Sequence, residues 1–167
     1  MEHNELAGLQ VPSLIMSPTD VSRLHREISA LHEYLQQQKL RSDNQMVSVL
    51  PKTSILLNEL ADSNKLDLRD AATREHLIDF LSDVAAHAPV LHISFATDPT
   101  SAFLQKIVQW LRQNIHTSLL VQVGIQPTIA AGCVVRTTNK YFDLSLRRSF
   151  AKHGDDLVKA LKTTAEV

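Results

Sequence analysis

The chain has 167 residues, of which 44% are hydrophobic and 21% are charged, with a formal net charge of −1 at pH 7. This size accommodates one domain or two small ones with a real hydrophobic core, and the composition is ordinary for a soluble globular protein. No apolar run approaches the ~20 residues of a membrane-spanning helix. The single Cys133 excludes an intrachain disulfide and is typical of a reducing cytoplasm.

The charge is unevenly distributed along the chain. Residues 1–132 carry 10 Lys and Arg against 14 Asp and Glu, whereas residues 133–167 carry 7 against 4. The basic residues near the C-terminus include Arg136, Lys140, Arg147, Arg148 and Lys152. Such a patch attracts nucleic acid or an acidic partner, although a solvated helix face explains it more simply. Few aromatic residues interleave these charges, so nucleic-acid binding is poorly supported.

The N-terminal part begins with an arm and a long helix. Residues 1–16 have no helical period and predict an extended arm. Ser17, Pro18 and Asp20 then form a helix start, with serine as the N-cap, proline at the first helical position and aspartate at the third. The pattern predicts an amphipathic helix over residues 18–40.

One apolar seam runs along this predicted helix, at alternating spacings of three and four: Val21, Leu24, Ile28, Leu31 and Leu35. Two heptads are short for a coiled coil, which normally needs three or four. Two interpretations therefore stay open. The helix docks on its own domain, or the seam binds a helix of another protein.

The remaining elements predict an α+β fold. Two further helices are expected, one after Leu50 and one over residues 70–86. A strand over 90–96, a helix from Asp98, and strands over 119–125 and 130–138 follow, and Asp143 and Ser145 are expected to open a last helix. The predicted organisation is an arm at 1–16, a region of about three helices at 17–88 and a small β-α-β-β-α domain at 89–163.

No catalytic constellation is found in the sequence. Phosphate-binding loops, dinucleotide fingerprints and zinc-protease helices are absent. No base is nominated to activate Cys133, and no two of the eight histidines are four residues apart, the spacing that lets both bind one metal ion on a helix. We therefore expect no enzyme, no catalytic or metal-binding residues and no cofactor.

The stretch from Val90 to Leu161 nevertheless resembles a known family. The order of strand, helix and strand, then Pro127-Thr-Ile-Ala-Ala-Gly132-Cys-Val-Val and Asp143-Leu-Ser145-Leu-Arg147, is similar to the C-terminal domain of the delta subunit of F-type ATP synthases, the oligomycin-sensitivity-conferring family. One departure is Ala131, where a second glycine is usual. The N-terminal half differs more, because the family normally carries a six-helix bundle there.

The resemblance implies a non-catalytic stator subunit. Such a subunit links the catalytic head of a rotary ATP synthase to its peripheral stalk and membrane sector, and so supports proton-driven ATP synthesis. It is cytoplasmic and held at the membrane only through the complex, with no insertion of its own and no small-molecule substrate. The expected partners are the alpha and b subunits.

Residues are assigned to this role in three groups. The seam Val21, Leu24, Ile28, Leu31 and Leu35 is the candidate for association with alpha or b helices. A basic group, candidate for holding the C-terminal end of b, contains Arg136, Lys140, Arg147 and Arg148. The structural motif consists of Pro127, Gly132, Asp143 and Ser145. Two alternatives remain: a stand-alone adaptor or regulator that shares the small α/β unit, and a nucleic-acid-binding module that uses the basic C-terminal face.

Overall fold

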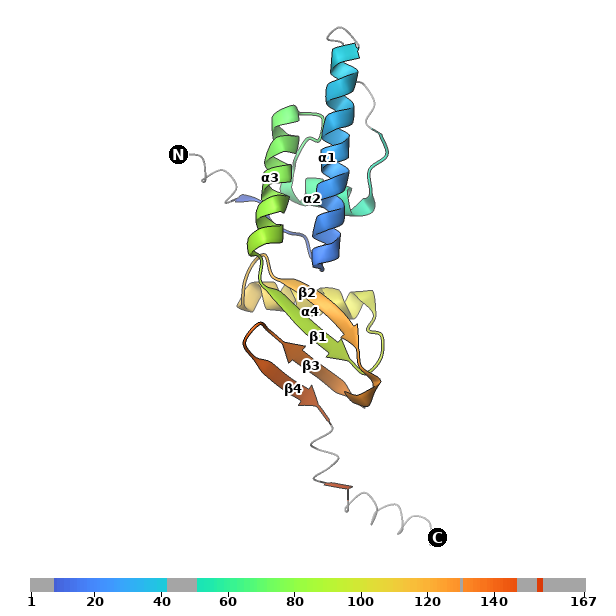
Figure 1. Ribbon diagram of the computed structural model, residues 1–167, viewed down its shortest axis with the longest axis vertical. Coiled ribbons are helices and arrows are strands. Elements are labelled where there is room, and N and C mark those ends of the chain that lie inside the picture. Colours follow the sequence, from blue (N-terminus) through green and yellow to red (C-terminus); the bar gives the residue numbers. More distant parts are fainter. Residues whose placement is uncertain (1–7, 42–50, 130, 147–152, 155–167) are drawn as a thin grey trace. The chain divides into compact units, whose positions relative to one another are not determined.

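The structure is a computed structural model that describes residues 8–41, 51–129, 131–146 and 153–154. Its elements, in chain order, are α1 (Pro18–Arg41), α2 (Ile55–Asn64), α3 (Ala71–His87), β1 (Val90–Phe95), α4 (Ser101–Asn114), β2 (Leu120–Ile125), a short 3-10 helix (Pro127–Ile129), β3 (Gly132–Arg136) and β4 (Tyr141–Ser145). The described residues thus form helices followed by a small sheet, which confirms the predicted α+β class (Figure 1). None of the helices described is long and apolar enough to cross a membrane.

The chain divides into two compact units. The first contains Met1–Val90 and Ala102–Val121, and the second contains Leu91–Ser101 and Gln122–Val167. Most of α4 therefore belongs to the same unit as the three helices that precede the sheet.

Helix α1 begins where the sequence predicts, because a reciprocal pair of hydrogen bonds caps it. The backbone N–H of Ser17 donates to Oδ2 of Asp20 at 2.9 Å, and the backbone N–H of Asp20 donates to Oγ of Ser17 at 3.2 Å. This arrangement satisfies donors that the first helical turn leaves unpaired.

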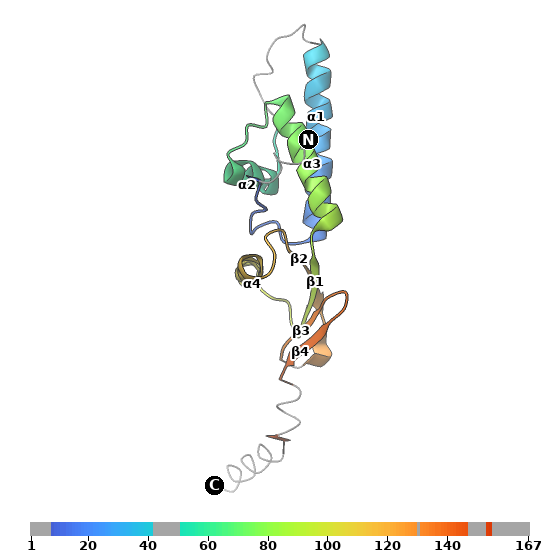
Figure 2. The same ribbon diagram turned by 90° about the vertical axis from the view of Figure 1, so that its left-hand side faces the viewer.

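Helices α1 and α3 lie side by side and run in opposite directions (Figure 1, Figure 2). They enclose one core with α2, in which the seam of α1 meets residues of the arm, of α2 and of α3. Leu57 and Leu60 come from α2, while Leu77 and Leu81 come from α3, and all four are almost completely buried. The N-caps Ser54 and Asp70 accept from the backbone N–H groups of Leu57 and Thr73, which starts each helix at a defined residue.

The sheet has the order β2-β1-β3-β4 and is mixed (Figure 1). Strands β1 and β3 are antiparallel, with His92 opposite Arg136 and Phe95 opposite Cys133. Strands β3 and β4 form an antiparallel hairpin. Strands β1 and β2 are joined by the crossover through α4 and point in the same direction in Figure 1.

Candidate functional site

The hairpin of β3 and β4 carries most of the residues that the sequence singles out. Its turn is closed by Thr137, whose N–H donates to the carbonyl of Lys140 at 2.8 Å and whose Oγ1 accepts from the N–H of Lys140 at 2.9 Å. The two strands pair from Arg136 opposite Tyr141 to Gly132 opposite Ser145. The hairpin thus fixes which side chains share a face.

Gly132 fits the close backbone approach expected at the start of β3. Its φ is +90°, a region that L side chains rarely adopt. A Cβ at this position would lie 2.5 Å from the carbonyl oxygen of Leu144. Glycine is therefore required here both by backbone conformation and by space.

The expectation that Asp143 and Ser145 open a helix is wrong. Both residues lie in β4, where Asp143 is opposite Val134 and Ser145 is opposite Gly132. The N–H of Ser145 donates to Oδ1 of Asp143 at 3.0 Å, so the aspartate caps a local turn at the end of the strand. The ladder with β3 continues past the predicted helix start, and this pairing outweighs the local capping signal.

Large apolar side chains are exposed along β4 and directly after it. The exposed fractions are 57% for Tyr141, 47% for Phe142, 61% for Leu144 and 48% for Leu146. Exposed apolar clusters of this kind mark interaction surfaces in soluble proteins. Phe142 and Leu144 lie on one face of β4, and Tyr141 lies on the opposite face with the pocket lining. We call Phe142, Leu144 and Leu146 the hairpin surface.

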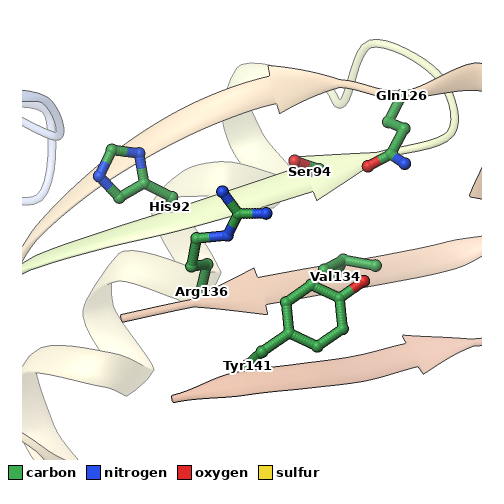
Figure 3. A pocket seen from close by; sticks show the side chains of 6 residues that line it. All are labelled: His92, Ser94, Gln126, Val134, Arg136 and Tyr141. Carbon is green, nitrogen blue, oxygen red and sulfur yellow. The ribbon is translucent and has the colours of Figure 1, made fainter. Parts of the chain in front are cut away.

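A pocket of about 310 Å³ lies in the second unit, on the face of the sheet (Figure 3). Strand β1 contributes His92 and Ser94, strand β3 contributes Val134 and Arg136, β4 contributes Tyr141, and Gln126 follows β2. The residues share a face because His92 is opposite Arg136, and Ser94 is opposite Val134.

Small residues explain why this part of the sheet is hollow. Gly124 lies beside Ser94, since a Cβ on Gly124 would come 3.3 Å from Oγ of Ser94. Gly124 has no side chain and Ser94 has a short one, so neither fills the space beside the larger lining side chains. Val134 is 6% exposed and is the single buried apolar residue in the lining.

The guanidinium of Arg136 lies 5.9 Å from the centre of the Tyr141 ring, within reach of a cation–π contact. Figure 3 shows the two side chains next to each other over the sheet. The register explains this contact, because the two residues are direct cross-strand partners.

The predicted basic group is only partly within the described residues. Arg136 lines the pocket, and Lys140 is exposed in the hairpin turn. Arg147 and Arg148 lie outside the described residues. Pro127 begins the 3-10 helix between β2 and β3, so it marks the end of the preceding strand as expected.

The assignment of the α1 seam to a partner is corrected by the structure. Val21, Leu24 and Ile28 are 0% exposed, and Leu31 and Leu35 are 5% and 7% exposed. All five belong to the core that α1 forms with α2 and α3. The seam therefore packs on its own domain, the other of the two interpretations left open by the sequence.

Two buried arginines were not predicted from the sequence. Arg112 donates to the carbonyls of Leu119, Val11, Pro12 and Ile15, and Arg74 donates to those of Leu68, Arg69 and Asp70. Burial lowers the pKa of Arg112 to about 10. Helical spacing gives a signal for both, because Arg112 shares a helix face with Val108, and Arg74 with Leu77.

No group of three or more metal-ligating side chains occurs among the described residues. Burial raises the pKa of the Cys133 thiol, which keeps it protonated and weakly nucleophilic at neutral pH.

In comparisons with known proteins, no protein-family model matches the chain and no curated protein matches it.

Proposed function

We propose that this protein is a delta-type stator subunit, a non-catalytic link between the catalytic head and the peripheral stalk of a rotary F-type ATP synthase. The observation that carries the proposal is the sequence of elements over the stretch that resembles this family. Strand β1, helix α4 and strand β2 are followed by Pro127, by Gly132 at a tight backbone approach and by a hairpin.

A stator must resist torque without performing chemistry, so its function depends on surfaces that bind other subunits. The hairpin surface supports this role, because Phe142 and Leu144 expose large apolar side chains on an edge strand of the sheet. Lys140 adds a positive charge in the adjacent turn. The proposal assigns binding of the b subunit to this surface.

Binding of the alpha subunit requires a different assignment. The seam of α1 is in the core of the first unit, so it is not accessible to an alpha-subunit helix. Contacts with the head would have to use exposed residues of that unit. The observations on the hairpin surface therefore support binding to the stalk more directly than binding to the head.

The test measures binding of the full chain to the purified b subunit by isothermal titration calorimetry. Leu144→Asp places a charge on the hairpin surface and is expected to weaken binding at least about tenfold. Leu40→Asp is the matched control, because Leu40 is 85% exposed on α1, and it should change the affinity less than about twofold.

A second variant addresses the basic residues that follow the hairpin. Reversing the charge of both Arg147 and Arg148 to Glu should weaken binding if they contact the b subunit. An unchanged affinity would remove these two residues from the interface. Absence of any binding to b by the unaltered chain would favour the stand-alone adaptor.

A further inference from the structure

We propose that the pocket on the sheet face binds a small organic anion through a phosphate or carboxylate group. The proposal is independent of the stator function, because it concerns a ligand that is bound and not converted. Its basis is the lining of the pocket, in which five of the six side chains are polar: His92, Ser94, Gln126, Arg136 and Tyr141.

The polar groups of the lining suit an anion, because all five carry at least one hydrogen-bond donor at neutral pH and none of them is a carboxylate. Arg136 supplies a planar fork of N–H groups, which matches the oxygens of a phosphate or carboxylate. Ser94 and Tyr141 add hydroxyl groups, and Gln126 adds an amide. A cation would find no acidic partner in this lining.

The charge of Arg136 is available to a ligand. Over the described ranges, no carboxylate forms an ion pair with its guanidinium, which lies over the ring of Tyr141. Asp143 is the nearby acidic residue of the hairpin, opposite Val134, but it is not part of the lining and accepts from the N–H of Ser145.

The pocket also offers contacts to an apolar part of a ligand. Val134 is buried among the lining residues, and the Tyr141 ring is 57% exposed beside the pocket (Figure 3). The volume of about 310 Å³ is at the lower end of the range found for small-molecule sites. An aromatic or aliphatic group that carries one oxyanion fits these properties better than a bare ion.

The experiment titrates the full chain with phenyl phosphate, benzoate and inorganic phosphate, followed by two-dimensional NMR at constant ionic strength. We expect saturable shifts of the backbone amides of His92, Ser94 and Arg136. Phenyl phosphate or benzoate should bind at least about threefold tighter than inorganic phosphate, because only they contact Tyr141 and Val134. Whichever of phenyl phosphate and benzoate binds with the higher affinity identifies the oxyanion that the site prefers.

Matched variants separate a built site from general charge attraction. Arg136→Gln should weaken binding by about tenfold to a hundredfold, since it removes a charge-assisted hydrogen bond. Lys140→Gln removes the same charge from the neighbouring turn, outside the lining, and should change the affinity less than about twofold. Ser94→Leu should block the pocket without any change of charge.

The proposal is overturned by either of two results. The first is the absence of saturable shifts in the pocket with all three probes. The second is an equal loss of affinity in Arg136→Gln and Lys140→Gln, which would show that the anion is attracted only by the net charge of the protein. Amide spectra of the free variants that match those of the unaltered chain outside the pocket establish that each variant is folded.

Discussion

Nη2 of Arg112 in α4 donates a hydrogen bond of 2.7 Å to the carbonyl oxygen of Ile15, across 97 residues of sequence. The same guanidinium donates to the carbonyls of Val11 and Pro12, also in the N-terminal arm, and to Leu119 just before β2. One buried cation thus holds an irregular segment against the core of the first unit. Backbone carbonyls that are buried without a helix or strand need such donors.

Replacing Arg112 by Met should destabilise the protein strongly. The methionine occupies similar space but leaves the buried carbonyls of Val11, Ile15 and Leu119 without this donor, which costs roughly 2–4 kcal/mol of unfolding free energy. Urea-induced unfolding followed by circular dichroism measures this loss. Arg23→Met, at an exposed position of α1, is the control and should stay within about 0.5 kcal/mol. Equal effects of the two substitutions would contradict the role of Arg112.

The seam of α1 should behave as core. Ile28→Ala removes a side chain that is 0% exposed and should cost about 2–5 kcal/mol of unfolding free energy, because it leaves a cavity. Leu40→Ala on the same helix removes a side chain that is 85% exposed and should cost less than about 0.5 kcal/mol. Denaturant unfolding of the isolated protein distinguishes them. A negligible effect of Ile28→Ala would contradict burial of the seam in the core.

Gly132→Ala should distort the hairpin. The φ of +90° and the 2.5 Å approach of a Cβ to the carbonyl of Leu144 both oppose a side chain, at a cost of roughly 1–3 kcal/mol. Gly8→Ala is a suitable comparison, because a Cβ there meets nothing within 4 Å. Thermal unfolding should show a lowered midpoint only for Gly132→Ala. Equal melting of both variants would contradict the requirement for glycine at position 132.

The charge of Asp70 should stabilise α3 in a pH-dependent way. Hydrogen bonds from Thr73 hold the pKa of this carboxyl below its ordinary value of 3.8. Since the folded pKa is lowered, the stabilisation is fully present above pH 3.8 and is lost as the pH falls through the folded pKa. The difference in urea midpoint between the unaltered protein and Asp70→Asn should therefore shrink below that pH. A difference that does not depend on pH would contradict this account.

Local signals predicted most of the fold. The start of α1 follows from Ser17 and Asp20, whose side chains bond to each other's backbone, and Asp70 likewise begins α3. Apolar periodicity identified the seam, but it does not say which surface the seam meets. The answer came from α3, which packs along α1 and is distant in sequence.

The predictions that were wrong or missed also depend on contacts between residues distant in sequence. Asp143 and Ser145 carry the residue types of a helix start, yet a cross-strand ladder with β3 holds them in a strand. Arginine is rarely buried, so Arg112 was not expected in the core, and its partners in the arm lie far away in sequence. The pocket depends on the register of four strands, which one sequence does not reveal.

The most direct test of the stator proposal is recovery of the tagged protein from detergent-solubilised membranes of its own cell, with identification of bound proteins by mass spectrometry. The account predicts alpha, beta and b subunits in a constant ratio to the chain, and loss of b from preparations of Leu144→Asp but not Leu40→Asp. A clean preparation of the protein without these subunits would contradict the proposal.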